Sequence, residues 1–365
     1  MIWHRLRSAT LASVLACVSA PALAQQPAAP QPPNQGERQA PTPAAKEPAF
    51  PTVSVGILSY LQYDAELQNR DDFNAFDVTR GYINIVADVA RNVRFRATPD
   101  VRRVTDGSLS GSLAFRMKYG FAEFDNLLGA RSWVRFGLHQ TPWLDFEESI
   151  NRYRVQGQMF SEREGIIAGS GDFGAGLLAP LPGGYGEVNA GIYNGEGFGS
   201  GEANKFKSFQ GRVTIRPFPQ APLARGLRIS GFYDQGAYAA DHPRRHGIVM
   251  ASFEHTHVVG TAQWLAGTER TLTRPTRAHF RGASAFAEVR QGPEGWAVIA
   301  RIDHFDPDHN TSDDSDRRLI AGVAYWLAWS KSRIGFVFDD EDVRYDAARN
   351  RPDENRLLFQ THIQF

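Results

Sequence analysis

Two stretches of the sequence carry side chains that could bind a metal ion. EHTHVVG holds His255 and His257 two residues apart, a spacing that puts both on one face of a strand, but no third ligand accompanies them. Residues 303–318, DHFDPDHNTSDDSDRR, are dense in acid but lack the glycine and the closing glutamate of a calcium loop. Nor is there a nucleophile elbow or another hydrolase motif. We therefore expect no metal site, no cofactor and no catalytic residue, which argues against an enzyme.

A second group of residues could act through charge. NVRFRAT carries Arg94 and Arg96, LAFRMKYGF carries Arg116 and Lys118, and the next extended segment carries Arg135. Because successive side chains of a strand point to opposite faces, the alternation sends all five cations to the same, non-lipid face. Neighbouring strands would place them next to one another as a basic wall. The alternative is that these groups pair with other charges and do no more than solvate an interior.

Acidic residues are concentrated in the longest stretch without strand character, HQTPWLDFEESINRYRVQGQMFSEREGIIAGSG. Its aromatic and aliphatic residues argue against disorder and favour a loop that packs inward on the rest of the protein. Acids outnumber bases within it and it contains no lysine, so an acidic loop would face the basic wall across a constriction. Its charged residues are Asp145, Glu147, Glu148, Arg152, Arg154, Glu162, Arg163 and Glu164.

Alternation with a period of two predicts the elements that position these groups. It also sends Arg212, Arg228, Arg301 and Asp303 to the interior face. Each segment has about the ~10 residues that a tilted strand needs to cross a bilayer. We predict sixteen strands, at 53–65, 77–90, 93–103, 112–124, 132–140, 171–179, 185–194, 206–216, 226–236, 246–254, 258–268, 282–290, 296–304, 317–328, 333–342 and 355–365.

The predicted connections alternate in length. Tight turns occur at Arg91-Asn92, Pro182-Gly183-Gly184, Pro293-Glu294-Gly295 and Ser330-Lys331-Ser332, and longer connections at 66–76, 104–111, 141–170, 195–205, 269–280, 305–316 and 343–354. Short turns on one side and long loops on the other are typical of an outer-membrane barrel. The predicted fold is therefore all-β, a transmembrane antiparallel β-barrel of about 16 strands with an inward-folded third loop.

A secreted β-sandwich is the competing fold, but it leaves aromatic residues at the strand ends unexplained. Trp296 and Trp329 flank short turns and Phe365 ends the chain, so a barrel would place all three at one membrane boundary. In a closed barrel the last strand must also pair with the first, because an open edge in hydrocarbon leaves backbone groups unsatisfied. Phe359, Ile363 and Phe365 would then face lipid.

The N-terminal region differs from the rest in composition. Residues 1–24 have basic residues, a short apolar stretch and a small-residue cleavage site, which predicts a secretory signal peptide. A lipoprotein signal ending before Cys17 is the weaker alternative. Residues 25–51 are rich in Pro, Ala and Gln and predict an extended periplasmic linker, which leaves 52–365 as the barrel.

The overall composition excludes two classes of protein. The 40 basic and 40 acidic residues cancel, which gives no case for a nucleic-acid partner. The longest apolar run of the predicted mature chain, Leu319 to Trp329, is too short for a membrane helix, which requires ~18 residues.

The segment VRFGLHQTPWLDFEE, the sixteen-strand count and RIDHFDPD together resemble the outer-membrane porins grouped with the phosphate-selective porins O and P. The resemblance implies a homotrimer of sixteen-stranded barrels, each with a third loop that narrows a water-filled channel. The anion-selective members line the constriction with lysines, and the absence of lysine from 141–170 departs from that pattern. The C-terminal strand also resembles the signal by which the outer-membrane assembly machinery recognises its clients.

These observations favour a porin in the outer membrane of a Gram-negative bacterium, for passive diffusion of small hydrophilic solutes, with anions as one option. Outer-membrane lipid and lipopolysaccharide would be its surroundings. Residues 303–318 form either a solvated acidic loop or a loop that binds cations bridging the lipopolysaccharide. A barrel enzyme and an adhesive or structural barrel are the alternatives. The first would need 10 or 12 strands and a catalytic cluster at the rim, and the second large outer loops and a plugged lumen.

Overall fold

The structure is a computed structural model that describes residues 49–70, 72–105, 107–202, 204–273 and 276–365. The predicted signal peptide and residues 25–48 of the predicted linker lie outside the described residues. Among the described residues, no helix is both long and apolar enough to cross a membrane.

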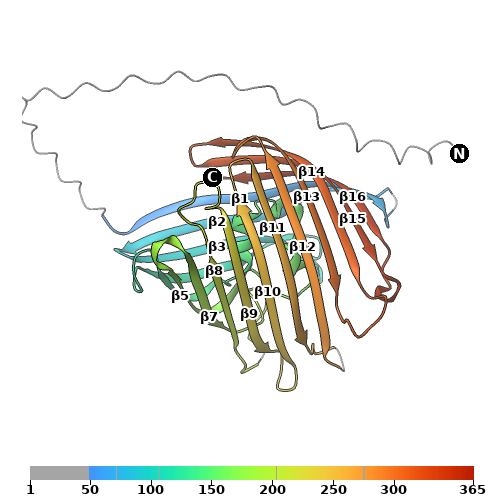
Figure 1. Ribbon diagram of the computed structural model, residues 1–365, viewed down its shortest axis with the longest axis horizontal. Coiled ribbons are helices and arrows are strands. Elements are labelled where there is room, and N and C mark those ends of the chain that lie inside the picture. Colours follow the sequence, from blue (N-terminus) through green and yellow to red (C-terminus); the bar gives the residue numbers. More distant parts are fainter. Residues whose placement is uncertain (1–48, 71, 106, 203, 274–275) are drawn as a thin grey trace, which may run out of the picture. The chain divides into compact units, whose positions relative to one another are not determined.

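Sixteen strands form one closed antiparallel barrel in which each strand pairs with its neighbours in sequence. Figure 1 shows them in order around the barrel, and the predicted fold class is confirmed. The strands are β1 Thr52–Gln68, β2 Asn74–Ala90, β3 Val93–Arg103, β4 Leu113–Asp125, β5 Trp133–Gln140, β6 Gly171–Pro180, β7 Gly186–Tyr193, β8 Ser208–Ile215, β9 Leu227–Ala237, β10 Pro243–Glu254, β11 Val258–Glu269, β12 Ala278–Arg290, β13 Gly295–Asp306, β14 Asp316–Trp329, β15 Ser332–Tyr345 and β16 Glu354–Gln364. Short helices occupy some connections: η1 Gly107–Leu109, α1 Leu144–Ile150, η2 Arg154–Gln156, α2 Phe160–Arg163, η3 Pro182–Gly184 and η4 Ala347–Arg349.

The chain end closes the barrel. β16 pairs with β1 in a register that sets Leu58 opposite Gln364 and Tyr63 opposite Phe359. The ladder continues to the last residue, because Phe365 N donates to Ile57 O at 3.0 Å and Ile57 N donates to Phe365 O at 2.8 Å. This confirms the expected pairing of the last strand with the first, which leaves no open edge between them.

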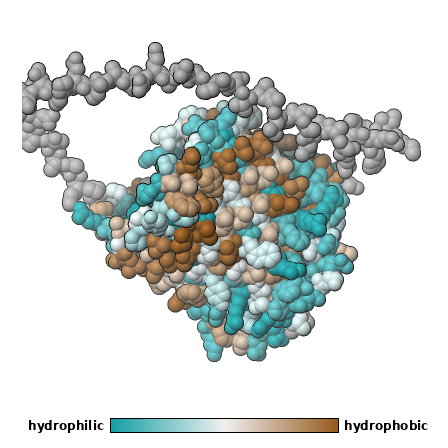
Figure 2. Space-filling view, viewed as in Figure 1, coloured by the Kyte–Doolittle hydropathy of each residue, from teal (hydrophilic) through white to brown (hydrophobic). Residues whose placement is uncertain are grey.

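The outer surface of the barrel is apolar and its inner surface is polar or covered by the third loop. On β13, Trp296, Val298 and Ile302 are more than half exposed, whereas the alternating Arg301 and Asp303 are buried. Figure 2 shows hydrophobic residues gathered over the middle of the face in view. An exterior of this kind needs hydrocarbon around it, and it confirms the expected outer-membrane location.

Aromatic side chains lie at the end of the barrel that carries the short turns. Trp329 is opposite Ser332 in the register of β14 and β15, and Trp296 is opposite Tyr325, with ring centroids 5.0 Å apart. Trp296, Trp329 and Phe365 are each more than half exposed. All three therefore point outward near one rim, the arrangement expected of an aromatic girdle.

Several predicted strand limits were wrong. β1 and β2 extend to Gln68 and from Asn74, so the connection placed at 66–76 is much shorter than predicted. Conversely, β8 covers Ser208–Ile215 rather than 206–216. Near the loops, polar residues continue the hydrogen-bonded ladder after the apolar alternation has ended, so alternation underestimates the length of such strands.

Candidate functional site

The connection between β5 and β6 folds into the barrel, as the sequence predicts for the third loop. β5, which precedes it, contains Gly137, whose φ of 121° favours glycine; a Cβ there would lie 2.5 Å from the carbonyl oxygen of Gly120. Helix α1 follows Pro142 and has Asp145 and Glu147 in its first turn, where carboxylates are favoured by the helix dipole. The connection thus has its own secondary structure inside the barrel.

One face of this loop is fixed to the wall formed by β9–β15 through a hydrophobic core. Trp143, Leu144 and Phe160 are fully buried. The ring of Trp143 lies 5.6 Å from that of Phe232 on β9, and the ring of Phe160 lies 6.3 Å from that of Phe305 on β13. Burial of side chains of this size stabilises the loop by roughly 1.5–3 kcal/mol each, so the loop is held firmly on this wall.

Hydrogen bonds add to the same attachment. Glu147 accepts from Gln263 Nε2 on β11 at 2.6 Å and from Trp143 Nε1 at 3.0 Å. Tyr153 Oη donates to Glu288 on β12 at 2.7 Å, and Arg152 also binds Glu288. Burial raises the pKa of Glu147 to about 7, against the lowering effects of Arg301 and of its two hydrogen-bond donors. Glu147 and Arg152 therefore attach the loop to β11 and β12, whereas the acids of the loop were expected to face the basic wall.

The opposite face of the loop carries Glu148 and Glu162 toward β2. Glu148 Oε2 lies 3.3 Å from Arg80 Nη1, and its other oxygen accepts from Arg154 Nε at 2.9 Å. Arg154 also binds Glu162 at 2.7 Å. Burial opposes ionisation of Glu148, but Arg80, Arg154 and Lys118 together lower its pKa. Adjacent residues on α1 thus point to opposite walls, since helix positions are about 100° apart.

Arg80 is a site residue that the sequence analysis missed. It is buried on the inner face of β2, with its guanidinium 5.2 Å from the ring centre of Tyr60 and 4.9 Å from that of Tyr82. The alternation of Arg80, Tyr82 and Asn84 with Gly81 and Ile83 could have identified it, because that spacing matches the one used for β3 and β4.

The five basic residues predicted on β3–β5 all lie on the inner side of the barrel, but part of this wall is neutralised. Glu123 on β4 accepts from Arg94 Nη1 at 2.8 Å and from Arg135 Nε at 2.6 Å, and Asp100 accepts from Arg116 Nε at 3.1 Å. Three of the five cations, Arg94, Arg116 and Arg135, are therefore paired with acids. Glu123 and Asp100 were not predicted as site residues, although each lies at an inward position of its strand, next to the basic residues that were predicted there.

Arg96 and Lys118 differ from these three. Arg96 donates to the neutral side chains of Thr98 and Asn84, at 3.0 and 2.7 Å. Lys118 has no ion pair with any described residue, and its ammonium lies 4.1 Å from the ring centre of Phe198. A β-bulge directs Lys118 to the inner face of the barrel. Thr98 pairs with Tyr119 but Pro99 pairs with Met117, so Lys118 and Tyr119 both point inward. Two unneutralised cations thus remain on the wall that faces Glu148.

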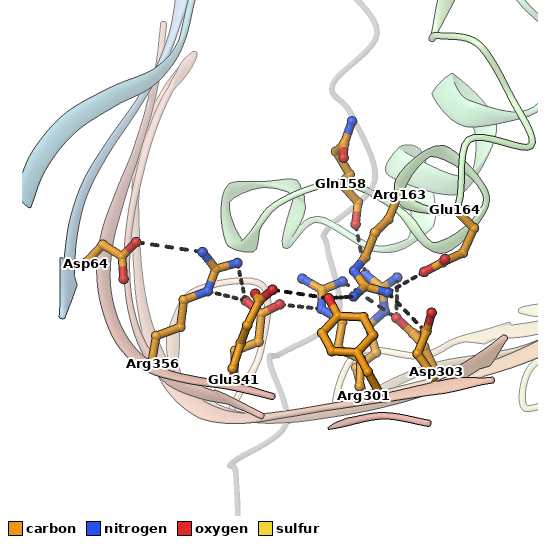
Figure 3. A network of polar contacts seen from close by, with 12 residues as sticks. Asp64, Gln158, Arg163, Glu164, Arg301, Asp303, Glu341 and Arg356 are labelled. Atoms are coloured by element: carbon orange, nitrogen blue, oxygen red, sulfur yellow. Dashed lines mark hydrogen bonds and ion pairs between the residues drawn. The ribbon is translucent and has the colours of Figure 1, made fainter. Parts of the chain in front are cut away.

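On the other wall, charges of opposite sign alternate from strand to strand. Arg301 pairs with Asp303 at 2.9 Å, Arg318 with Glu341 at 2.6 Å, and Arg356 with Glu341 at 2.9 Å. Figure 3 shows this network running from Asp64 to Asp303, with Gln158, Arg163 and Glu164 reaching it from the loop. Arg301 donates to Gln158 O at 3.3 Å, and Arg163 lies 3.5 Å from Asp316. Arg301, Asp303, Arg163 and Glu164 are thereby brought together.

The other predicted inward residues lie at the short-turn end. Arg212 is buried, donates to Pro142 O at 2.8 Å and to Glu187 at 2.6 Å, and covers the ring of Phe146 at 3.8 Å. Arg228 pairs with Glu254 at 2.5 Å. Arg212 therefore supports the loop from the short-turn end of the barrel.

Two cavities flank the loop inside the barrel. One of about 520 Å³ lies toward the long connections and is lined by Arg163, Glu341 and Arg356 among others. Another of about 690 Å³ lies toward the short turns, beneath Phe146 and Ser149. Within the residues that the structure describes, no three His, Cys, Asp or Glu side chains are grouped to hold a metal ion. The site is thus a charged barrel interior with a cavity on each side of the third loop.

A closed sixteen-stranded barrel with an apolar exterior and a loop folded into a charged interior defines the class of outer-membrane β-barrel proteins with the porin fold. No family model and no curated protein matches this chain.

Solved structures do match. A loop-deletion mutant of OmpT, an outer-membrane protein of Vibrio cholerae, covers 86% of this chain and 99% of its own with a TM-score of 0.61 at 11% identity. An anion-selective porin from Comamonas acidovorans has the same coverage, with a TM-score of 0.59 at 12% identity. OmpF of Salmonella typhi covers 86% of this chain and 97% of its own, with a TM-score of 0.59 at 10% identity. At these identities the likeness shows the fold, and the resemblance to the phosphate-selective porins O and P stays a prediction.

Proposed function

We propose that this protein is an outer-membrane porin that lets small hydrophilic solutes diffuse passively past its third loop. The observation that carries the proposal is the division of the loop into two faces. One face is packed and hydrogen-bonded to β9–β15, while Glu148 on the other pairs with Arg80 at 3.3 Å and lies within electrostatic reach of Lys118. A loop held in this way narrows the passage without depending on a ligand.

The charges on the two sides of this passage create a transverse field. Glu148 and Glu162 provide its negative side and Arg96 and Lys118 its positive side, whereas Arg80 and Glu148 pair with each other at 3.3 Å. Such a field orients polar solutes and disfavours uncharged apolar ones. We infer a preference for small polar solutes, with anions favoured where the unneutralised cations of the wall lie closest to the path.

Three further points belong to this proposal. The chain is exported with a cleaved signal peptide, and it assembles as a homotrimer, as a trimer form of the Vibrio cholerae OmpT structure suggests by fold. The C-terminal strand ending in Phe365 is read by the outer-membrane assembly machinery. Lipopolysaccharide surrounds the rim that carries the long connections.

The test is a planar lipid bilayer containing the purified protein. We expect stepwise single-channel currents in potassium chloride and, under a salt gradient, a reversal potential that reports which ion passes more easily. A protein that inserts and remains silent would remove the porin function. Detergent-free solubility and recovery from the periplasm would remove the membrane location as well.

A further inference from the structure

The cavity on the short-turn side of the loop has an unusual charge distribution. It has a volume of about 690 Å³ and is bounded by the ends of β6–β10, the β4–β5 turn and the exposed side of α1. Its charged lining consists of four arginines and two glutamates: Arg131, Arg216, Arg225, Arg228, Glu187 and Glu254. The volume falls within the ~300–1,000 Å³ range of small-molecule sites.

Both glutamates are already engaged by other cations. Glu254 pairs with Arg228 at 2.5 Å, and Glu187 pairs with Arg212, which lies deeper in the barrel, at 2.6 Å. Arg131, Arg216 and Arg225 form no side-chain hydrogen bond or ion pair with any residue that the structure describes. Three arginines that form no ion pair with a described residue, the half-buried Arg216 and the exposed Arg131 and Arg225, therefore line one concave space.

The surroundings of Arg216 disfavour its positive charge. Arg216 follows the last residue of β8 and is partly buried. Burial and the nearby charge of Arg228 lower the pKa of Arg216, against the smaller raising effects of Glu187 and Glu254. A cation that is both desolvated and close to another cation gains when an anion binds next to it.

The cavity on the other side of the loop provides an internal comparison, because its arginines are paired. Arg163 and Arg349 contact Asp316 at 3.5 and 2.8 Å. Arg351 and Arg356 contact Glu354 and Glu341 at 3.4 and 2.9 Å. An excess of arginines without an ion pair therefore distinguishes the short-turn cavity from the cavity on the other side of the loop.

We infer that the short-turn cavity is a binding site for a small solute with two or more carboxylate or phosphate groups. Guanidinium groups bind such oxyanions through paired, charge-assisted hydrogen bonds, and three of them around one space favour a polyvalent anion over a monovalent one. The inference rests on the proposed channel function, which brings solutes to this cavity, and it assigns a solute class to one half of the channel.

The test measures binding of citrate and of inorganic pyrophosphate to the purified full-length mature protein in detergent, by calorimetry at low ionic strength. We expect saturable binding of one or both and at least about tenfold weaker binding in the double variant Arg216→Gln/Arg225→Gln, since tenfold corresponds to about 1.4 kcal/mol, roughly the contribution of a single charged contact. The matched control Arg349→Gln/Arg351→Gln removes the same charge from the other cavity and should bind within about twofold of the wild type. If the first variant does not fold, Arg131→Gln in the β4–β5 turn takes its place.

Absence of saturable binding to the wild type, or equal weakening in the control variant, would overturn the inference. Citrate binding without pyrophosphate binding would assign the site to carboxylates, and the reverse result to phosphates. A protein that conducts ions but binds neither anion loses this site and keeps the proposed channel. A protein that binds the anions in detergent but never conducts keeps the site and loses the channel.

Discussion

Arg80 of β2 and Glu148 of α1 meet inside the barrel, with Arg80 Nη1 3.3 Å from Glu148 Oε2. Sixty-eight positions separate them in sequence. Glu148 reaches Arg80 because Leu144, Glu147 and Ile150 bury the other face of the same helix against the opposite wall. This contact joins the third loop to β2, and the ion selectivity of the proposed channel should be sensitive to both charges.

Neutralising Glu148 should make the channel favour anions more strongly. A unit charge about 7 Å from an ion in water contributes about 0.6 kcal/mol, which is roughly a threefold change in the permeability ratio. Reversal potentials under a salt gradient measure this ratio for Glu148→Gln. The matched control is Glu294→Gln in the exposed turn between β12 and β13, which should leave the ratio unchanged. Equal ratios in both variants would mean that Glu148 does not line the path.

The combined substitution of Arg94, Arg96 and Arg116 by glutamine should shift the reversal potential toward cation selectivity. The shift should be several times that of a single neutralisation, because three inward charges are removed at once. Arg103→Gln is the control on the same strand, since Arg103 is exposed and paired with Asp77. No shift in the triple variant would exclude these residues from the ion path.

Stability should depend on pH through Glu147. Its pKa rises from an ordinary 4.5 to about 7 in the folded protein, chiefly by burial. The folded state therefore holds a proton that the unfolded state releases, so the contribution is complete below pH 4.5 and is lost as pH rises through 7. The loss amounts to about 3 kcal/mol, measurable as a lower urea midpoint of unfolding in detergent at pH 8 than at pH 5. Glu147→Gln should flatten this part of the profile, and an unchanged slope in the variant would contradict the assignment.

Phe160→Ala should loosen the third loop. Phe160 is fully buried against Phe305 and lies beneath Gly282, so truncation leaves a cavity and costs about 3–5 kcal/mol. Single-channel records should show larger or fluctuating currents. Phe136→Ala removes the same ring from the lipid-facing side of β5 and should leave the currents as they are. Steady, unaltered currents from the Phe160 variant would show that this anchor is not needed to hold the loop.

Alternation along single strands predicted much of the architecture. Phe359 and Gln360 are neighbours in sequence, yet one is exposed to the apolar phase and the other is buried inside, as a period of two requires. The sixteen strands, the closing pair of β1 and β16 and the inward loop follow from that period, from connection lengths and from the need to satisfy every backbone group in hydrocarbon. These features depend on local sequence, so the pattern within each strand is sufficient to predict them.

Tertiary structure decided which charges meet. Glu147 and Glu148 have the same chemistry and adjacent positions. The packing of Trp143 and Leu144 directs Glu147 toward Gln263 on β11 and Glu148 toward Arg80 on β2. Likewise Glu123 neutralises Arg94 and Arg135 because β3, β4 and β5 are neighbours in one register, and the bulge opposite Pro99 turns Lys118 inward. Such pairings depend on the relative position of segments that are distant along the chain. Alternation within a segment predicts on which face of the strand a side chain lies. It does not predict which residue of another strand that side chain contacts.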